Sequence, residues 1–249
     1  MRVISYNLRK HAAAHELEEL VEARGANVLC LQEADTAAMP QHISGLTLAR
    51  ATSQNRLGLA LYYRENMFQL QDVVTLELKK SLHDIVLKPA HERVLAARLR
   101  DIDAGRDVII ASFHAAPLTA LNSLRRHQIR TALAELQKMG EGVPILMVGD
   151  YNYPVFKERL SERVRRAGYD LTLSDSRTYT RYRFFKGHYD FATSVGLDIE
   201  KVTTLPQGAS DHLPILITAT YKQGHEEFRS ASNPSHDEEY VAEDGPATG

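Results

Sequence analysis

The sequence predicts an α/β fold of the sandwich type in a single domain. Short strand-like runs recur along almost the whole chain, and a few amphipathic helical patterns lie between them. Some neighbouring strand-like runs are separated only by turns, which favours antiparallel pairing over an all-parallel sheet with a helix after every strand. A hydrophobic content of 43% is ordinary for a soluble protein with a sizeable core.

The predicted strands are short runs rich in apolar and β-branched residues. They cover residues 2–6, 28–32, 58–63, 73–78, 94–100, 108–114, 145–148, 189–194 and 213–221. The sequence shows no internal repeat and no Gly/Ser-rich linker among them. We therefore expect residues 1–221 to form one domain.

Three segments have the spacing of amphipathic helices. Residues 12–24 place apolar side chains on one side and end at Gly25, a common helix cap. Residues 118–139 repeat leucine and isoleucine at helical spacing, with Pro144 beyond the end. Residues 157–167 form the third pattern. The helices are thus fewer than the strands and interspersed among them.

The last 28 residues differ from the rest of the chain. Residues 222–249 lack hydrophobic periodicity and are rich in Ser, Gly, Pro and acidic residues, which predicts a disordered tail. They hold two basic residues and seven acids, a net charge of −5, which leaves about +3 for residues 1–221 of a chain with net charge −2. The acids are Glu226, Glu227, Asp237, Glu238, Glu239, Glu243 and Asp244. A mildly positive body suits an anionic substrate.

Composition also bears on location. The single cysteine, Cys30, lies in an apolar run and is expected in the core, so no disulfide forms within the chain. The N-terminus enters a strand pattern directly, and no apolar stretch is long enough to span a membrane. A cytoplasmic protein without a membrane segment is the expectation, and no protein partner is inferred.

Polar residues recur where apolar runs end. If a sheet brings these ends to one edge, they gather acids, amides and imidazoles in one cleft. The residues are Asn7, Glu33, His114, Asp150, Asn152, Asp190, Asp211 and His212. Hard cations such as Mg²⁺ take oxygen ligands and need only one or two carboxylates beside substrate phosphate oxygens. Glu33 and Asp211, with Asn7 nearby, supply such ligands, and Mn²⁺ is an acceptable substitute for Mg²⁺.

The other residues of this set suit acid–base chemistry. A carboxylate beside an imidazole fixes its tautomer and favours the protonated form, and Asp190 with His212 is the candidate pair. The Asp-x-Asn spacing lets Asp150 point toward an attacking water and Asn152 toward a phosphoryl oxygen.

Six short blocks resemble, in order, the signature of the endonuclease/exonuclease/phosphatase superfamily, the deoxyribonuclease I-like proteins. They are Ser5-Tyr6-Asn7, Leu31-Gln32-Glu33, Ser112-Phe113-His114, Gly149-Asp150-Tyr151-Asn152, His188-Tyr189-Asp190-Phe191 and Ser210-Asp211-His212-Leu213-Pro214. Each block alone is weakly specific, but the presence of all six in this order is a strong indication of the family. The resemblance implies a four-layer αββα sandwich, with helices outside two mainly antiparallel β-sheets and the cleft at one sheet edge.

The resemblance also implies roles. Glu33 would be the main metal ligand, with Asn7 and Asp211 holding the metal or its waters. His114 would stabilise the transition state, Asp150 would orient or deprotonate water, Asn152 would bind phosphate, and Asp190 would brace His212. The residues after Asn7 (Leu8-Arg9-Lys10) and after Glu33 (Ala34-Asp35) differ from those usual in abasic endonucleases and exonuclease III. The sequence therefore disfavours these repair enzymes as close relatives of this chain.

A stretch of alternating cations and aromatics precedes Asp190. Its members Arg181, Tyr182, Arg183 and Lys186 are candidate substrate-binding residues, because cations contact phosphates and rings stack on bases; the alternative is a surface loop. Arg125, Arg126 and Gln128 follow His114 on a helix and either pair with nearby polar groups or approach the cleft, the structural role being favoured.

Three functions are compatible with the sequence. The favoured one is a metal-dependent phosphodiesterase or nuclease that hydrolyses nucleic acid with an activated water. The second keeps this chemistry and takes a small phosphoester or a phospholipid headgroup. The third is an inactive binding module, which the complete set of acids disfavours.

Overall fold

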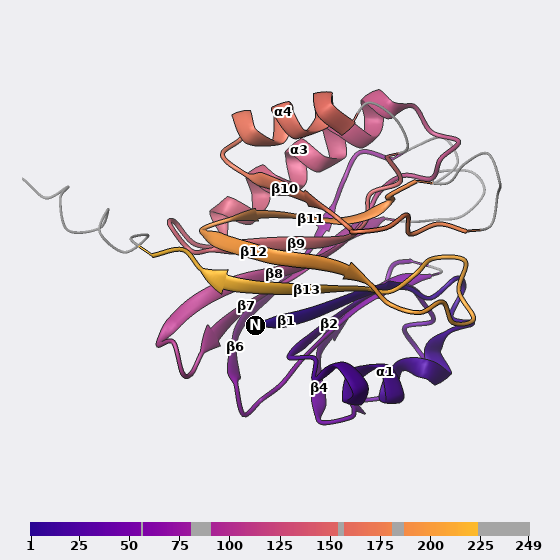
Figure 1. Ribbon diagram of the computed structural model, residues 1–249, viewed down its shortest axis with the longest axis vertical. Helices are drawn as coiled ribbons and strands as arrows, with labels where there is room; N and C mark the ends of the chain where they lie inside the picture. Colours follow the sequence, from indigo (N-terminus) through magenta and orange to yellow (C-terminus); the bar gives the residue numbers. More distant parts are fainter. Residues whose placement is uncertain (56, 81–90, 154–156, 181–186, 224–249) are drawn as a thin grey trace, which may run out of the picture.

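The computed structural model shows two packed β-sheets between two helical layers (Figure 1). It describes residues 1–55, 57–80, 91–153, 157–180 and 187–223. Within these ranges no helix is long and apolar enough to cross a membrane. The four-layer sandwich expected from the sequence is confirmed.

The first sheet has, within the described residues, seven strands in the order β12-β13-β1-β2-β5-β4-β3. Its strands are β1 (Arg2–Asn7), β2 (Val28–Ala34), β3 (His42–Ile43), β4 (Leu46–Ala51), β5 (Gly58–Tyr63), β12 (Leu197–Thr204) and β13 (Ile215–Tyr221). Neighbours β1 and β2 are parallel, and the other neighbouring pairs are antiparallel. The parallel pair brings the C-terminal ends of β1 and β2 to the same edge.

The second sheet has six described strands in the order β10-β11-β9-β8-β7-β6. They are β6 (Phe68–Glu77), β7 (Glu92–Asp101), β8 (Arg106–His114), β9 (Ile145–Asp150), β10 (Asp170–Leu173) and β11 (Asp190–Val195). Here β8 and β9 form the parallel pair and the remaining neighbours are antiparallel. The C-terminal ends of β8 and β9 therefore also meet at one edge.

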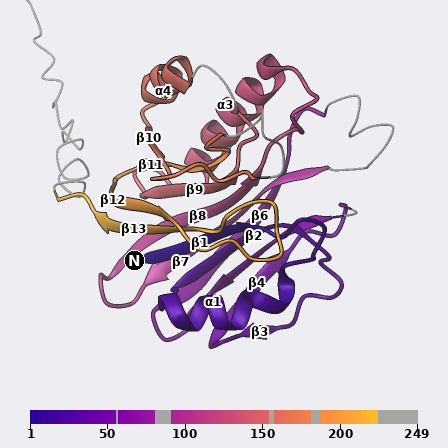
Figure 2. The ribbon, with the colours of Figure 1, turned by 45° about the vertical axis from the view of Figure 1, so that its right-hand side comes forward.

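Three apolar clusters among the described residues hold the layers together. One lies between the sheets and includes Cys30, Leu61 and Val148, all fully buried. A second joins the six-stranded sheet to α3 (Asn122–Lys138) and α4 (Lys157–Arg166), and a third joins the seven-stranded sheet to η1 (Ala14–Glu16) and α1 (Leu17–Arg24). Figure 2 shows α1 on one outer side and α3 and α4 on the other. Apolar burial is the main stabilising contribution in such a stack.

The predicted elements are present, with shifted ends, and the described residues contain four strands that were not predicted. The nine predicted strands and three helices correspond to β1, β2, β5–β9, β11 and β13, and to η1 with α1, α3 and α4. Strand β13 begins at Ile215, two residues later than predicted, because Pro214 has no backbone N–H to donate to the ladder. The unpredicted strands are β3, β4, β10 and β12, which lie at or next to the sheet edges. Edge strands are short or partly solvated, so their apolar signal is weak.

Candidate active site

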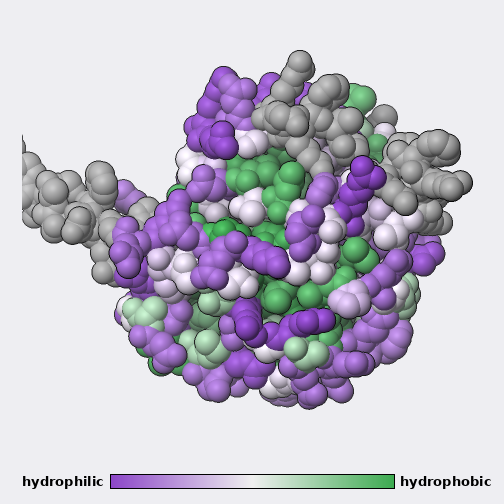
Figure 3. Space-filling view, viewed as in Figure 1, coloured by the Kyte–Doolittle hydropathy of each residue, from purple (hydrophilic) through white to green (hydrophobic). Residues whose placement is uncertain are grey.

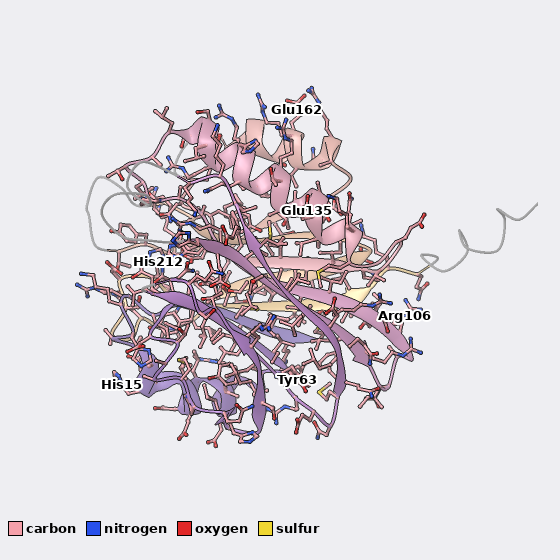
Figure 4. The ribbon with its side chains drawn as sticks, turned by 180° about the vertical axis from the view of Figure 1, so that it is seen from behind. His15, Tyr63, Arg106, Glu135, Glu162 and His212 are labelled. Atoms are coloured by element: carbon pink, nitrogen blue, oxygen red, sulfur yellow. The ribbon has the colours of Figure 1, made fainter. Side chains whose placement is uncertain are left out.

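The registers of three neighbouring strands place three of the predicted residues side by side. His114 at the end of β8 pairs with Asp150 at the end of β9, and Asp190 at the start of β11 pairs with Asp150 from the other side. All three therefore lie at one edge of the six-stranded sheet. Figure 4 labels His212, whose ring lies at this same end of the sandwich.

Asp150 is the centre of the hydrogen bonding at this edge. Its Oδ2 accepts from Asn7 Nδ2 at 3.1 Å and from Asn152 Nδ2 at 3.1 Å, and its Oδ1 accepts from the Asn152 backbone N–H at 2.9 Å. Asn7 ends strand β1 of the other sheet, so this bond joins the two sheets at the site. Burial raises the pKa of the Asp150 carboxyl above its usual value, and the carboxylates of Asp190 and Glu33 raise it further.

His212 and Asp190 form a buried pair. His212 Nδ1 lies 2.8 Å from Asp190 Oδ2, and His212 Nε2 lies 3.8 Å from Asp150 Oδ2. The ring also packs edge-on against Tyr179, with centroids 4.9 Å apart. Burial alone lowers the pKa of His212, but Asp190 and Asp150 outweigh it and raise the pKa above its ordinary value. The pair therefore favours an imidazolium that directs Nε2 toward Asp150.

His114 has the opposite electrostatic setting. Its Nε2 lies 3.7 Å from Asp150 Oδ2, the carboxylate that the structure places beside it. Burial lowers the pKa of His114 well below its ordinary value, and the nearby cations Arg93 and His212 lower it further. Arg93 also donates from Nη1 to the carbonyl oxygens of His114 and Ala115. One neutral and one charged imidazole thus flank the same carboxylate oxygen.

Glu33 reaches the site because of a bulge in strand β2. The register between β2 and β5 shifts between Leu31 and Ala34, and Glu33 has a φ of 53°, which few non-glycine residues adopt. Its Oε2 accepts from the Lys10 backbone N–H at 2.9 Å, and its carbonyl accepts from the His11 N–H at 2.9 Å. A residue held in this conformation costs about 1–3 kcal/mol, a cost typical of functional positions.

The chain after Asn7 bridges the acids of the proposed metal site. Arg9, Lys10 and His11 have φ values of 48°, 56° and 69°, so three non-glycine residues in succession lie in the left-handed region. The Asn7 Oδ1 accepts from the Arg9 N–H at 3.0 Å, and Arg9 Nε lies 3.7 Å from Asp211 Oδ2. This turn therefore contacts Asn7 and Glu33 through its backbone and Asp211 through a side chain.

The donor set fits a hard divalent cation. Four carboxylates and the Asn7 amide converge on one edge. Burial raises the pKa of Asp150, the carboxylates of Asp190 and Glu33 raise it further, and a cation would relieve this repulsion. Potential ligand atoms of Asp150, Asp190 and His212 lie within 4.8 Å of one another. That group differs from the predicted ligands Glu33, Asn7 and Asp211. The pairing of His212 with Asp190 favours the protonated imidazole, which has no lone pair to offer a cation.

Two buried hydroxyls position these groups, and only the structure reveals their roles. Thr178 Oγ1 accepts from the Tyr189 N–H at 3.0 Å and from the Asp190 N–H at 3.1 Å, and Thr178 is fully buried. Ser210 Oγ donates to the Asn7 carbonyl at 2.6 Å and accepts from the His212 N–H at 3.1 Å. Thr178 lies outside the polar strand ends and therefore carries no signal in the sequence.

The remaining predictions have mixed outcomes. Arg125 donates to the Pro117 carbonyl and to Asn122 Oδ1, and Gln128 bonds the Ala116 N–H and the Lys79 carbonyl, so both have structural roles. Arg126 donates to the Tyr153 hydroxyl at 3.2 Å. The predicted substrate-binding residues Arg181, Tyr182, Arg183 and Lys186 lie outside the described residues.

Two curated proteins resemble the chain in sequence. The chain is 22% identical over 218 residues to carbon catabolite repressor protein 4 homolog 5 of Arabidopsis thaliana, covering 78% of this chain but only 46% of that protein. It is 27% identical over 239 residues to UPF0294 protein YE0917 of Yersinia enterocolitica, covering 87% of this chain and 82% of that protein. The chain thus spans about half the length of the plant relative.

Solved structures share the fold, and a family model covers most of the chain. D. rerio TDP2, complexed with single-strand DNA product, matches with a TM-score of 0.71 at 13% identity, over 88% of this chain and 98% of that one. A mannosyl-6-phosphatase of Bacteroides thetaiotaomicron matches with a TM-score of 0.70 at 14% identity, over 89% and 100%. The endonuclease/exonuclease/phosphatase family model matches residues 4–212. The chain therefore belongs to this family of phosphoester hydrolases.

Proposed function

We propose that the protein is a divalent-metal-dependent phosphodiesterase that hydrolyses nucleic acid. The observation that supports this most directly is the linkage of both sheets at Asp150, whose Oδ2 accepts from Asn7 and lies within 4 Å of His114 and His212. Such an arrangement presents a base, two imidazoles and amide donors to one phosphoryl group. The positive charge of residues 1–221 is consistent with a polyanionic substrate.

The proposed mechanism begins with the carboxylate of Asp150. The separations of 3.7 and 3.8 Å from its Oδ2 to the two imidazoles exceed a hydrogen bond. An oxygen atom placed about 2.8 Å from the carboxylate and from an imidazole can contact both at once. Asp150 orients the attacking water and takes its proton, while the side-chain amide of Asn152 lies beside it to contact the phosphoryl group.

The two imidazoles act on the charge that develops at phosphorus. His212, held by Asp190, donates a hydrogen bond from Nε2 to a phosphoryl oxygen, and His114 offers a second, neutral hydrogen-bond donor. A divalent cation bound by Glu33, Asn7 and Asp211 would supply Lewis-acid stabilisation of the phosphoryl and leaving oxygens. The water oxygen bonds to phosphorus as the bond from phosphorus to the leaving oxygen breaks, the leaving oxygen takes a proton from solvent, and no covalent enzyme intermediate is needed.

An assay against a panel of phosphoesters tests which class of substrate the protein hydrolyses. The purified protein is incubated with Mg²⁺ or Mn²⁺ and single-stranded DNA, double-stranded DNA, RNA, mannose 6-phosphate, sphingomyelin or bis(p-nitrophenyl) phosphate. We expect hydrolysis of a nucleic acid and of the generic diester, abolished by EDTA and by Asp150→Asn. Hydrolysis confined to the monoester or to sphingomyelin would replace nucleic acid by a small phosphoester or a lipid headgroup. Full activity of Asp150→Asn would overturn the assigned site.

Replacing the partner of His212 is expected to remove most of the turnover. In Asp190→Asn the amide no longer supplies the charge that fixes and protonates the imidazole, so kcat should fall by about 10²–10⁴-fold with a smaller change in KM. Steady-state kinetics on bis(p-nitrophenyl) phosphate measure both constants. Asp175→Asn is the matched control, because that carboxylate binds Thr204 on an exposed part of the chain. Equal kcat values for both variants would contradict the role of Asp190.

The positioning role of Thr178 predicts a loss that serine rescues. Thr178→Val keeps the shape but leaves the N–H groups of Tyr189 and Asp190 without their acceptor, at a cost of about 1–3 kcal/mol. We expect kcat to fall about tenfold with KM nearly unchanged, and Thr178→Ser to restore it. If both variants lose kcat in proportion to their loss of melting temperature, the hydroxyl has no role in positioning.

A further inference from the structure

A groove lies between helices α3 and α4, away from the catalytic cluster. It has a volume of about 630 Å³ and is lined by Ser123, Arg126, His127, Ile129, Arg130, Leu133, Leu160, Arg163, Val164, Arg166 and Ala167. The two helices lie side by side on the outer face of the six-stranded sheet in both ribbon views (Figures 1 and 2). Figure 3 shows mainly hydrophilic residues over the outermost part of this layer.

Basic side chains line the groove, and the apolar side chains at its floor are already buried. Four arginines and one histidine line it, and no acidic side chain of the described residues does. The floor residues Ile129, Leu133, Leu160 and Val164 are each only 2% exposed. A hydrophobic partner would therefore find little apolar surface to bury, whereas guanidinium groups bind phosphate oxygens with good geometry. The accessible chemistry of the groove favours a polyanion over an amphipathic helix.

One lining residue links the groove to the chain segment that carries the candidate active site. Arg126, which lines the groove, donates to the hydroxyl of Tyr153, and Tyr153 follows Asn152 in the chain. From Ser123 to Leu133 the lining part of α3 spans about 15 Å at the helical rise of about 1.5 Å per residue. At a spacing of about 3.4 Å per nucleotide, that length matches roughly four nucleotides of a strand.

We propose that this groove binds the phosphodiester backbone of the nucleic acid strand beyond the cleaved phosphate. Arg130 and Arg163 line it from α3 and α4, and they contact successive phosphates, while Arg126 contacts Tyr153, the residue after Asn152. The inference rests on the proposed function, since it supplies the binding of a polymeric substrate to the same site. It predicts that strand length and groove charge control affinity, while the chemistry at Asp150 does not depend on them.

The test measures binding without turnover. Fluorescence anisotropy in EDTA compares a labelled 16-nucleotide DNA strand with a trinucleotide, for the full chain and for Arg130→Gln/Arg163→Gln. The matched control is Lys138→Gln/Arg165→Gln, which makes the same charge change on the same two helices outside the groove. We expect the groove variant to bind the long strand about tenfold more weakly, with its log-log salt slope reduced by about 1.4, and the trinucleotide unchanged.

The outcomes separate this inference from the proposed function. The groove variant should keep the parent kcat on bis(p-nitrophenyl) phosphate. Equal weakening by the control variant, no preference of the parent for the long strand, or equal competition by poly-glutamate of matched charge would overturn the groove as a nucleic acid site. A different measurement tests the proposed function. That function fails if Asp150→Asn still hydrolyses bis(p-nitrophenyl) phosphate at the parent rate.

Discussion

Glu33→Gln is expected to lower kcat by about 10³-fold while leaving the fold intact. The proposed role of Glu33 is to hold a divalent cation, and loss of Lewis-acid stabilisation worth about 4 kcal/mol corresponds to that factor. Glutamine keeps an oxygen that can accept from the Lys10 N–H, so the bulge in β2 retains its main contact. It also removes one negative charge near Asp150, so the metal-free variant should melt within about 2 °C of the parent or slightly above it.

Melting curves with and without metal distinguish this role from a purely structural one. At a hundredfold excess of Mg²⁺ or Mn²⁺ over its Kd, binding stabilises the parent by about 2.7 kcal/mol, or roughly 5–10 °C for a chain of this size. Glu33→Gln should lose most of that shift, and Glu65→Gln, an exposed glutamate outside the site, should keep it. A full metal-induced shift in Glu33→Gln would move the cation to other ligands, with Asp150, Asp190 and His212 the first group to test.

The sequence predicted which polar residues lie together better than it predicted the conformations that hold them there. Asn7, His114 and Asp150 end regular strands whose apolar runs are easily recognised. The register of β8 and β9 pairs His114 with Asp150, and a hydrogen bond between the sheets joins Asn7 to Asp150. By contrast, nothing in the sequence marks the bulge at Glu33 or the left-handed turn at residues 9–11. These conformations are unfavourable locally and persist only because contacts distant in sequence hold them. Local propensity therefore cannot predict them.

The edge strands and the order of strands within each sheet could not be predicted from the sequence either. Strand β12 alternates buried and charged positions irregularly, with a register shift between Ile199 and Lys201, so its pattern matches no simple period. The parallel pairs β1–β2 and β8–β9 lie in separate sheets. The assignment of each strand to a sheet depends on packing across the whole core rather than on any one segment. The four-layer architecture therefore came from the family resemblance, and the registers came from the structure.

Gly149→Ala is expected to disrupt both the stability of the fold and the geometry of the site, although it adds only one methyl group. Gly149 has a φ of 146° and pairs with Phe113, and a Cβ at this position would lie 1.9 Å from the Phe113 carbonyl oxygen. Because the obstacle is backbone, the parallel strands β8 and β9 must separate. We expect a loss of about 3–5 kcal/mol, which lowers the melting temperature by roughly 10 °C. Thermal melting followed by circular dichroism measures this loss.

The same change should impair catalysis through the two residues that flank the contact. His114 follows Phe113 and Asp150 follows Gly149, so separating the strands moves an imidazole and its neighbouring carboxylate apart. A misplacement of about 1 Å costs on the order of 10²-fold in rate, and kcat on bis(p-nitrophenyl) phosphate at a temperature where the variant is folded measures it.

Gly105→Ala is the matched control for the close approach of the two strands. Gly105 has a φ of 62°, and no atom of the described residues lies within 4 Å of the point that a Cβ would occupy there. Only about 1–2 kcal/mol of backbone strain and no loss of kcat are therefore expected. Equal effects at the two glycines would show that backbone conformation alone, rather than the close approach of β8 and β9, makes Gly149 necessary.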